Sequence, residues 1–185
     1  MAINEQDLKE IINESVLDKI HFEFVQALPL YCWVAGGSII DSIIGKEIND
    51  IDIFFSSEQD KFEAVKHVLK NEGQMIKALG PNGGVKVNIK NFCCDFISYK
   101  NVKTPKECVE SFDFTICGVA VDKNREVFYS DYFLNDYSKR LLRYTGNHIT
   151  LPRNKAARAL KYINKGFSFN AETQKEWIQS FTNNK

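Results

Sequence analysis

Residues 36–52 read GGSIIDSIIGKEINDID, and this stretch decides the fold that we expect. The apolar run 31–35 before it predicts a buried strand that stops at Gly36-Gly37. Residues 38–44 then predict a short helix closed by a glycine, and residues 50–55 predict the next strand. Side chains two apart in a strand share a face, so Asp50 and Asp52 point the same way and can reach one metal cluster.

The turn between the first strand and the helix has a composition that suits phosphate binding. Gly36 and Gly37 allow the backbone to approach a phosphate closely, and Ser38 supplies a hydroxyl donor or a helix cap. A tight strand-to-helix connection explains the same residues without a ligand. The turn therefore gains meaning only from the carboxylates that follow it.

Asp95 is a third candidate carboxylate, because it interrupts the apolar run 92–97. A charge in the middle of such a strand is costly unless it is paired or binds a metal. Asp50, Asp52 and Asp95 on neighbouring strands would hold two Mg²⁺ ions, with Asp95 nearest the attacking hydroxyl as ligand or general base. An edge-strand charge or a structural ion pair is the alternative for Asp95.

With these residues in place, residues 36–52 resemble the G-G-x-V-R-D-x-L-L-G-x-x-x-x-D-x-D signature of the polymerase β-like nucleotidyltransferases. The resemblance is to the head domain of tRNA CCA-adding enzymes and bacterial poly(A) polymerases. It implies that Asp50 and Asp52 bind the catalytic metals. It also implies that the triphosphate of an NTP is held by Gly36, Gly37 and Ser38.

A second segment, residues 113–120, is similar to the R-R-D-F-T-I-N-A-L-A segment of the same family, which contributes to sugar and nucleotide binding. Phe112 replaces the usual arginine and Cys117 the usual asparagine. Asp113 is thus the sugar contact that the resemblance implies, and pairing at the start of the strand is its structural alternative.

Later basic segments look like arginine-rich segments of the family, and they make Arg143 and Arg158 candidates for binding the triphosphate or an RNA backbone. Surface helix charge is the simpler explanation for most of these residues. The chain departs from the family at Ile40, where arginine is usual, and no E-D-x-x-R segment precedes Arg158. Selection of C and then A is therefore not implied.

The expected fold class is α/β (α+β), a mixed β-sheet nucleotidyltransferase palm flanked by helices, with a short helical C-terminal part. We expect a catalytic head over residues 1–135, including an N-terminal helix, and a small basic helical region over residues 136–185. The other elements that the pattern predicts are helices over 4–28, 58–71, 153–165 and 171–181, strands over 85–89, 92–98 and 114–121, an edge strand over 126–129, and a loop over 80–84.

Composition places the chain among globular proteins, with 185 residues of which 44% are hydrophobic and a formal net charge of zero. Residues 135–185 nevertheless contain ten Lys/Arg against three Asp/Glu, which suits RNA or phosphate as well as a solvated helix face. The five cysteines have no C-x-x-C spacing, and we expect them to be reduced and mostly buried. With no apolar stretch near eighteen residues, we expect no membrane partner and a cytoplasmic protein.

The expected function is transfer of an NMP from an NTP to a hydroxyl, with release of pyrophosphate and dependence on Mg²⁺. The basic tail and the resemblance favour an RNA acceptor, in particular a tRNA 3′ end. Two alternatives stay open. One is transfer to a protein or small-molecule hydroxyl in a regulatory or toxin–antitoxin pair, and the other is an inactive module that binds nucleotide or RNA.

Overall fold

The computed structural model describes residues 3–71, 73–78, 84–89, 92–146 and 152–182. Within these residues one mixed sheet has seven strands in the order β3-β4-β5-β2-β1-β6-β7. The strands are β1 Cys32–Ala35, β2 Ile51–Phe55, β3 Gly73–Ala78, β4 Val85–Ile89, β5 Phe92–Ile97, β6 Val119–Asp122 and β7 Val127–Tyr129. β2 and β5 are parallel, and the other neighbours are antiparallel, so the predicted mixed sheet is confirmed.

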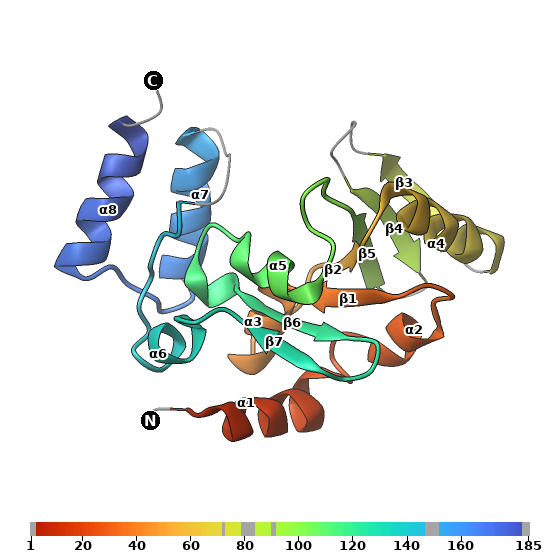
Figure 1. The fold of residues 1–185 in the computed structure, drawn as a ribbon, viewed down its shortest axis with the longest axis horizontal. Coiled ribbons are helices and arrows are strands. Elements are labelled where there is room, and N and C mark those ends of the chain that lie inside the picture. Colours follow the sequence, from red (N-terminus) through yellow and green to blue (C-terminus); the bar gives the residue numbers. More distant parts are fainter. Residues whose placement is uncertain (1–2, 72, 79–83, 90–91, 147–151, 183–185) are drawn as a thin grey trace.

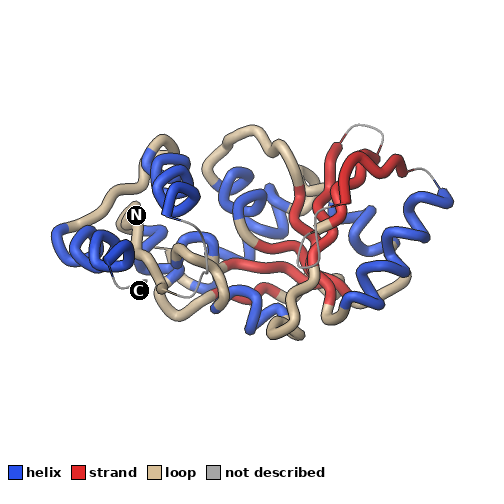
Figure 2. Tube along the Cα trace, turned by 90° about the horizontal axis from the view of Figure 1, so that it is seen from above, coloured by secondary structure: helices blue, strands red, loops and turns tan. Residues whose placement is uncertain are grey.

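Helices surround this sheet (Figure 1). They are α1 Glu5–Ile11, α2 Phe22–Ala27, α3 Gly37–Ile43, α4 Glu58–Asn71, α5 Pro105–Glu110, α6 Phe133–Ser138, α7 Pro152–Ile163 and α8 Ala171–Thr182. Along the longest axis of the molecule, α7 and α8 lie at one end, and α4 with β3 lies at the other (Figures 1 and 2). No helix in the described part of the chain has both the length and the apolar character needed to cross a bilayer.

The two faces of the sheet pack against different partners. Cys32, Val34, Ile53 and Phe55 belong to the larger core cluster, which includes buried residues of α1, α2, α3 and α4. Trp33, Ala35 and Phe54 alternate with them and pack with buried residues of α5 in a second cluster. Asp52 has the same parity along β2 as Phe54, so the strand alternation presents its carboxylate on the α5 face of the sheet.

The C-terminal helical part is attached to the head through buried aromatic residues. Tyr162 and Phe167 are members of the larger core cluster, and the Phe114 and Tyr162 rings lie 5.8 Å apart edge to face. The boundary predicted between residues 135 and 136 falls inside α6. α8 begins with a reciprocal cap, in which the Thr173 amide donates to Asn170 Oδ1 and the Asn170 amide donates to Thr173 Oγ1.

Most predicted elements appear close to their expected bounds, but the N-terminal helix predicted over 4–28 is wrong as one element. α1 passes into a π-helical turn, Ile12–Val16, and α2 follows only after His21, whose φ is +50°. Leu17 and Ile20 in the connecting turn are buried. Helical spacing of apolar residues therefore continues through a segment where the chain changes direction.

The strand predicted over 114–121 is wrong in its first half. Thr115–Cys117 form a 3₁₀ turn, and only Val119 onward pairs in the sheet. The Thr115 amide donates to the Arg143 carbonyl at 3.1 Å instead of to a neighbouring strand. Because every residue from Phe114 to Val121 is buried, an apolar run could not separate turn from strand here.

Three elements are absent from the prediction. These are β3, which begins at Gly73, the short helix α5 between β5 and β6, and the short helix α6 after β7. α5 has a readable signal in Thr104, Pro105 and Glu107, which form a capping box with proline in the first turn. Most of the loop predicted over 80–84 lies outside the described residues.

Candidate functional site

The three carboxylates come together on the α5 face of the sheet. β2 and β5 are adjacent parallel strands, and Asp52 stands directly beside Asp95 in their register. Asp50 precedes β2 by one residue and has the parity of Asp52. The expected adjacency of Asp95 to the Asp50-Asp52 pair is therefore present.

Burial and mutual repulsion raise the pKa values of two of these groups. The pKa of Asp52 rises to about 7, first because the carboxyl is desolvated and then because Asp50 and Asp95 are negative, while Lys161 and Arg158 act in the opposite direction. Burial also raises the pKa of Asp95, partly offset by Lys86. The charged forms of Asp52 and Asp95 are thus destabilised in the structure as it stands, and a bound cation would stabilise them.

Gly36 joins the glycine turn to this carboxylate site. Its φ is +87°, and a Cβ built on it would lie 3.1 Å from the Phe112 ring and 4.0 Å from Asp52 Oδ2. Phe112 is held there by Phe54, at 6.1 Å edge to face. Phe112, which replaces the family arginine, therefore packs its ring against the glycine turn.

Gly36→Ala is expected to lower the free energy of unfolding by about 2 kcal/mol, since an L-residue in this conformation is strained and its methyl group meets Phe112. Gly45→Ala is the matched control, because Gly45 also has a positive φ (+73°) but nothing within 4 Å of the added Cβ. It should lose only about 1 kcal/mol. Equal losses in chemical denaturation would show that the Phe112 contact is unimportant.

Two polar atoms near the start of α3 and on β5 lack partners. Ser38 Oγ and Asp95 Oδ1 are buried, and neither has a hydrogen-bond partner among the described residues. Buried polar atoms are normally satisfied, so such atoms at a candidate site indicate groups that a ligand completes. Ser38 is the serine of the predicted phosphate turn.

A basic helix face lies next to this turn. A Cβ built on Gly37 would be 3.8 Å from both Lys161 Nζ and Tyr162 Oη, so side chains of α7 lie beside the turn. Lys161 is exposed at this position. We did not predict Lys161 as a site residue, although it lies three residues after Arg158 and so on the same helix face.

Arg158 and Asp113, both predicted to contact the nucleotide, are bonded to one another. Arg158 Nη2 donates to Asp113 Oδ1 at 2.7 Å, and Arg158 Nε donates to Asp113 Oδ2. The Asp113 side chain is 1% exposed, whereas that of Arg158 is 34% exposed. The pair ties α7 to the start of the 3₁₀ turn, and Arg158 keeps part of its guanidinium accessible.

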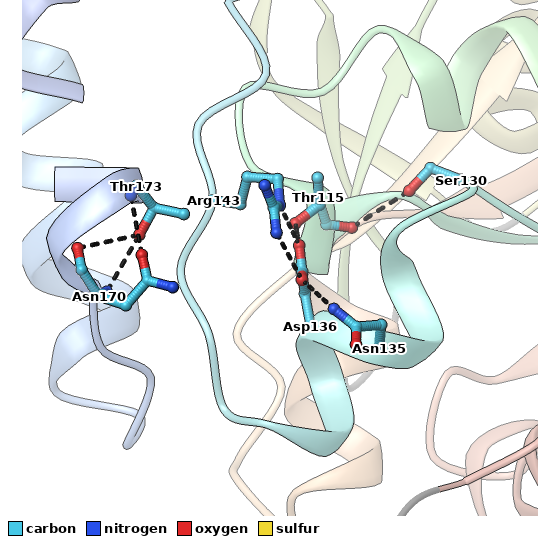
Figure 3. A network of polar contacts seen from close by, with 7 residues as sticks. All are labelled: Thr115, Ser130, Asn135, Asp136, Arg143, Asn170 and Thr173. Atoms are coloured by element: carbon cyan, nitrogen blue, oxygen red, sulfur yellow. Dashed lines mark hydrogen bonds and ion pairs between the residues drawn. The ribbon is translucent and has the colours of Figure 1, made fainter. Parts of the chain in front are cut away.

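Arg143 is also paired with a buried carboxylate (Figure 3). Its Nε donates to Asp136 Oδ2 at 2.9 Å, and Thr115 Oγ1 donates to the same oxygen at 2.7 Å. Asp136 is fully buried in α6. Arg143 therefore fastens α6 to the 3₁₀ turn, and an alanine there would strand a buried charge as well as remove a cation.

Lys86 is a further residue of this site that we did not predict. Its Nζ lies 2.7 Å from Asp50 Oδ2 and 3.3 Å from Asp95 Oδ2, and it stands directly opposite Asp95 across β4 and β5. Strand alternation could have placed it on this face. In the arrangement described, no three His, Cys, Asp or Glu side chains lie together as a ready metal site within the described residues.

Comparison with known proteins agrees with the fold. The Thermotoga maritima CCA-adding enzyme complexed with tRNA has a TM-score of 0.70 at 18% identity, covering 94% of this chain and 44% of that one. The CCA-adding enzyme of Staphylococcus haemolyticus is 27% identical over 138 residues, which are 69% of this chain and 33% of that enzyme. The predicted likeness to a nucleotidyltransferase head domain is confirmed.

A phage protein is similar to the same extent. Gabija anti-defense 2 of Bacillus phage SPbetaL7 is 26% identical over 136 residues, covering 73% of this chain and 33% of that protein. The chain thus spans about a third of the length of these curated relatives. A family described as "Gabija anti-defense 2 family protein" matches residues 4–140. Because that match covers most of the chain, the chain belongs to the Gabija anti-defense 2 family.

Proposed function

We propose that this chain transfers an NMP from an NTP to a hydroxyl acceptor and releases pyrophosphate. The observation that carries the proposal is the convergence of Asp50, Asp52 and Asp95 on one sheet face, with Gly36 of the glycine turn beside Asp52. Attack of a hydroxyl on an α-phosphate needs alignment of the reactants and neutralisation of phosphate charge. The glycine turn can align the triphosphate, and the carboxylates can hold the metal ions that neutralise its charge.

Magnesium fits the residues that are present. Asp50, Asp52 and Asp95 offer only hard oxygen donors, and Asp95 Oδ1 lacks a partner among the described residues. The charged form of Asp52 is destabilised first by desolvation and then by its negative neighbours. When bound, Mg²⁺ would lower the pKa of the attacking hydroxyl and neutralise charge on the leaving pyrophosphate. We assign a two-ion site to these three carboxylates, with Asp95 also the candidate general base.

The turn and α7 would bind the triphosphate. Gly36 and Gly37 place no side chain between the backbone and a phosphate, and Ser38 Oγ has no hydrogen-bond partner within the described structure. Lys161 adds a positive charge beside Gly37. The exposed part of Arg158 is available to a phosphate while Asp113 holds its other edge. Because both Asp113 oxygens bind Arg158, we assign Asp113 an action on the nucleotide through Arg158 in place of the predicted sugar contact.

The acceptor that we favour is an RNA 3′ end. The basic region 136–185, which remains our proposed second unit, and the tRNA bound to the Thermotoga enzyme support this choice. Arg143 stays a prediction as an RNA or triphosphate contact. Family membership supports a second acceptor class, a hydroxyl of a protein or small molecule in a counter-defence setting. Either reaction suits the cytoplasm, where NTPs and reduced cysteines occur.

Label transfer tests the proposal. The chain is incubated with each α-³²P-labelled NTP and Mg²⁺, together with pooled tRNA or with a cell protein extract. Label in RNA is the expected result, and label in protein would move the acceptor to the second class. Absence of label with every NTP and acceptor, together with absence of NTP-dependent pyrophosphate release, would refute transfer and leave a binding module.

A further inference from the structure

Lys86 occupies the space between two of the three carboxylates. Its ammonium forms ion pairs with Asp50 Oδ2 and Asp95 Oδ2, and its side chain is 28% exposed. The contact with Asp95 joins residues directly opposite in the β4–β5 pair, so the backbone register fixes it. Partial burial keeps solvent from screening these contacts fully.

A divalent cation shared by Asp50 and Asp95 would need the same negative region. The ammonium on Asp50 Oδ2 and Asp95 Oδ2 repels a cation that binds the same two oxygens, because the two positive charges would lie at contact distance. A metal that binds through these two Oδ2 atoms must therefore displace the ammonium.

We propose that Lys86 is a built-in competitor for the divalent cation, so that a metal binds Asp50 Oδ2 and Asp95 Oδ2 only when the ammonium leaves them. The inference rests on the proposed metal-dependent function. Released Lys86 lies at the edge of the site, where the phosphates of an NTP offer it a new partner. The lysine thus weakens binding of the cation alone and favours joint binding of cation and nucleotide.

Direct titration with Mn²⁺, followed by the electron paramagnetic resonance signal of the free ion, tests this without an activity assay. Lys86→Met in the whole chain is expected to bind Mn²⁺ at least about tenfold more tightly than wild type, because a competing charge is removed. Lys86→Arg keeps the competing charge and should stay weak. Lys86→Gln carries the same expectation as Lys86→Met and serves if that variant does not fold.

The matched control is Lys66→Met, which removes the same charge from α4, where Lys66 pairs with Glu63. It should leave Mn²⁺ affinity unchanged. Adding Asp95→Asn to Lys86→Met should cancel the gain, because the freed carboxylate is what the ion uses. Equal affinity in wild type and Lys86→Met, or weaker binding in the variant, overturns the role of Lys86. Absence of Mn²⁺ binding in every variant overturns the proposed metal site as well.

Discussion

Asp52→Asn is expected to reduce NMP transfer by about a thousandfold or more, since it removes a metal-binding charge worth about 4 kcal/mol of transition-state stabilisation. Asp52 is the carboxylate that faces both Asp95 and the glycine turn. Its loss therefore affects metal and triphosphate positioning together. Initial rates of pyrophosphate release at saturating NTP measure the effect.

The same substitution should stabilise the protein when divalent cations are absent. The folded-state pKa of Asp52 is about 7, whereas an unfolded aspartate titrates near its ordinary value of 3.8. Between these pH values the unfolded chain loses a proton that the folded chain keeps, so rising pH lowers the free energy of unfolding. Asparagine does not titrate, so the stability of the variant carries no such dependence on pH. We therefore expect Asp52→Asn to be more stable than wild type at about pH 8.

Chemical denaturation in EDTA at about pH 8 and about pH 4 separates the two effects, because the stability difference should shrink at the lower pH. Ser56→Ala, at the residue directly after β2, is a control that leaves the three carboxylates intact. A variant that is inactive and also less stable at both pH values would indicate misfolding. Full activity in Asp52→Asn would refute the two-metal site.

Arg158→Met is expected to lower the free energy of unfolding by about 3 kcal/mol, because it leaves the Asp113 carboxylate buried without its partner. For a chain of this length that loss corresponds to a fall in melting temperature of about 6–12 °C. Scanning calorimetry measures it. The double variant Arg158→Met with Asp113→Asn should recover part of the loss, since no unpaired charge then remains.

Lys161→Met is the matched comparison on the same helix. Lys161 is exposed beside Gly37, so its removal should weaken NTP binding while the melting temperature stays near that of wild type. We thus assign NTP binding to Lys161 and a stabilising ion pair to Arg158. A large loss of stability in Lys161→Met, or none in Arg158→Met, would contradict this assignment. Fluorescence titration with an NTP analogue supplies the binding measurement.

The sequence was sufficient for the centre of the fold because several local signals agree there. The glycine turn, the short helix closed by Gly45, and the alternation around Asp52 each fix local geometry. The adjacency of Asp95 could be inferred only from the cost of an unpaired charge inside an apolar strand, since strand order itself is set by long-range pairing. Short apolar segments such as Thr115–Cys117 gave no periodicity from which to choose between turn and strand.

Ion pairing was the least predictable part of the site. Arg158 and Asp113 are 45 positions apart, and Lys86 and Asp50 are 36 positions apart, so only the assembled fold brings them together. The sequence pattern makes Arg143 and Arg158 candidate contacts of the triphosphate or RNA, and it makes no prediction for Lys86. In the structure, Arg158 pairs with the buried carboxylate of Asp113 and Arg143 with that of Asp136, so each arginine also has a structural role.

The anchoring of α7 has an evolutionary consequence. Arg158 holds Asp113 before the 3₁₀ turn, and Lys165, two residues after the end of α7, pairs with Asp41 of α3. Each acid is buried, so neither partner can change alone without stranding a charge. Leu160 and Ile163, which are exposed on the same helix, carry no such constraint. Substitutions should therefore accumulate on α7 at exposed positions, whereas Arg158 and Lys165 persist or are lost only together with Asp113 and Asp41, respectively.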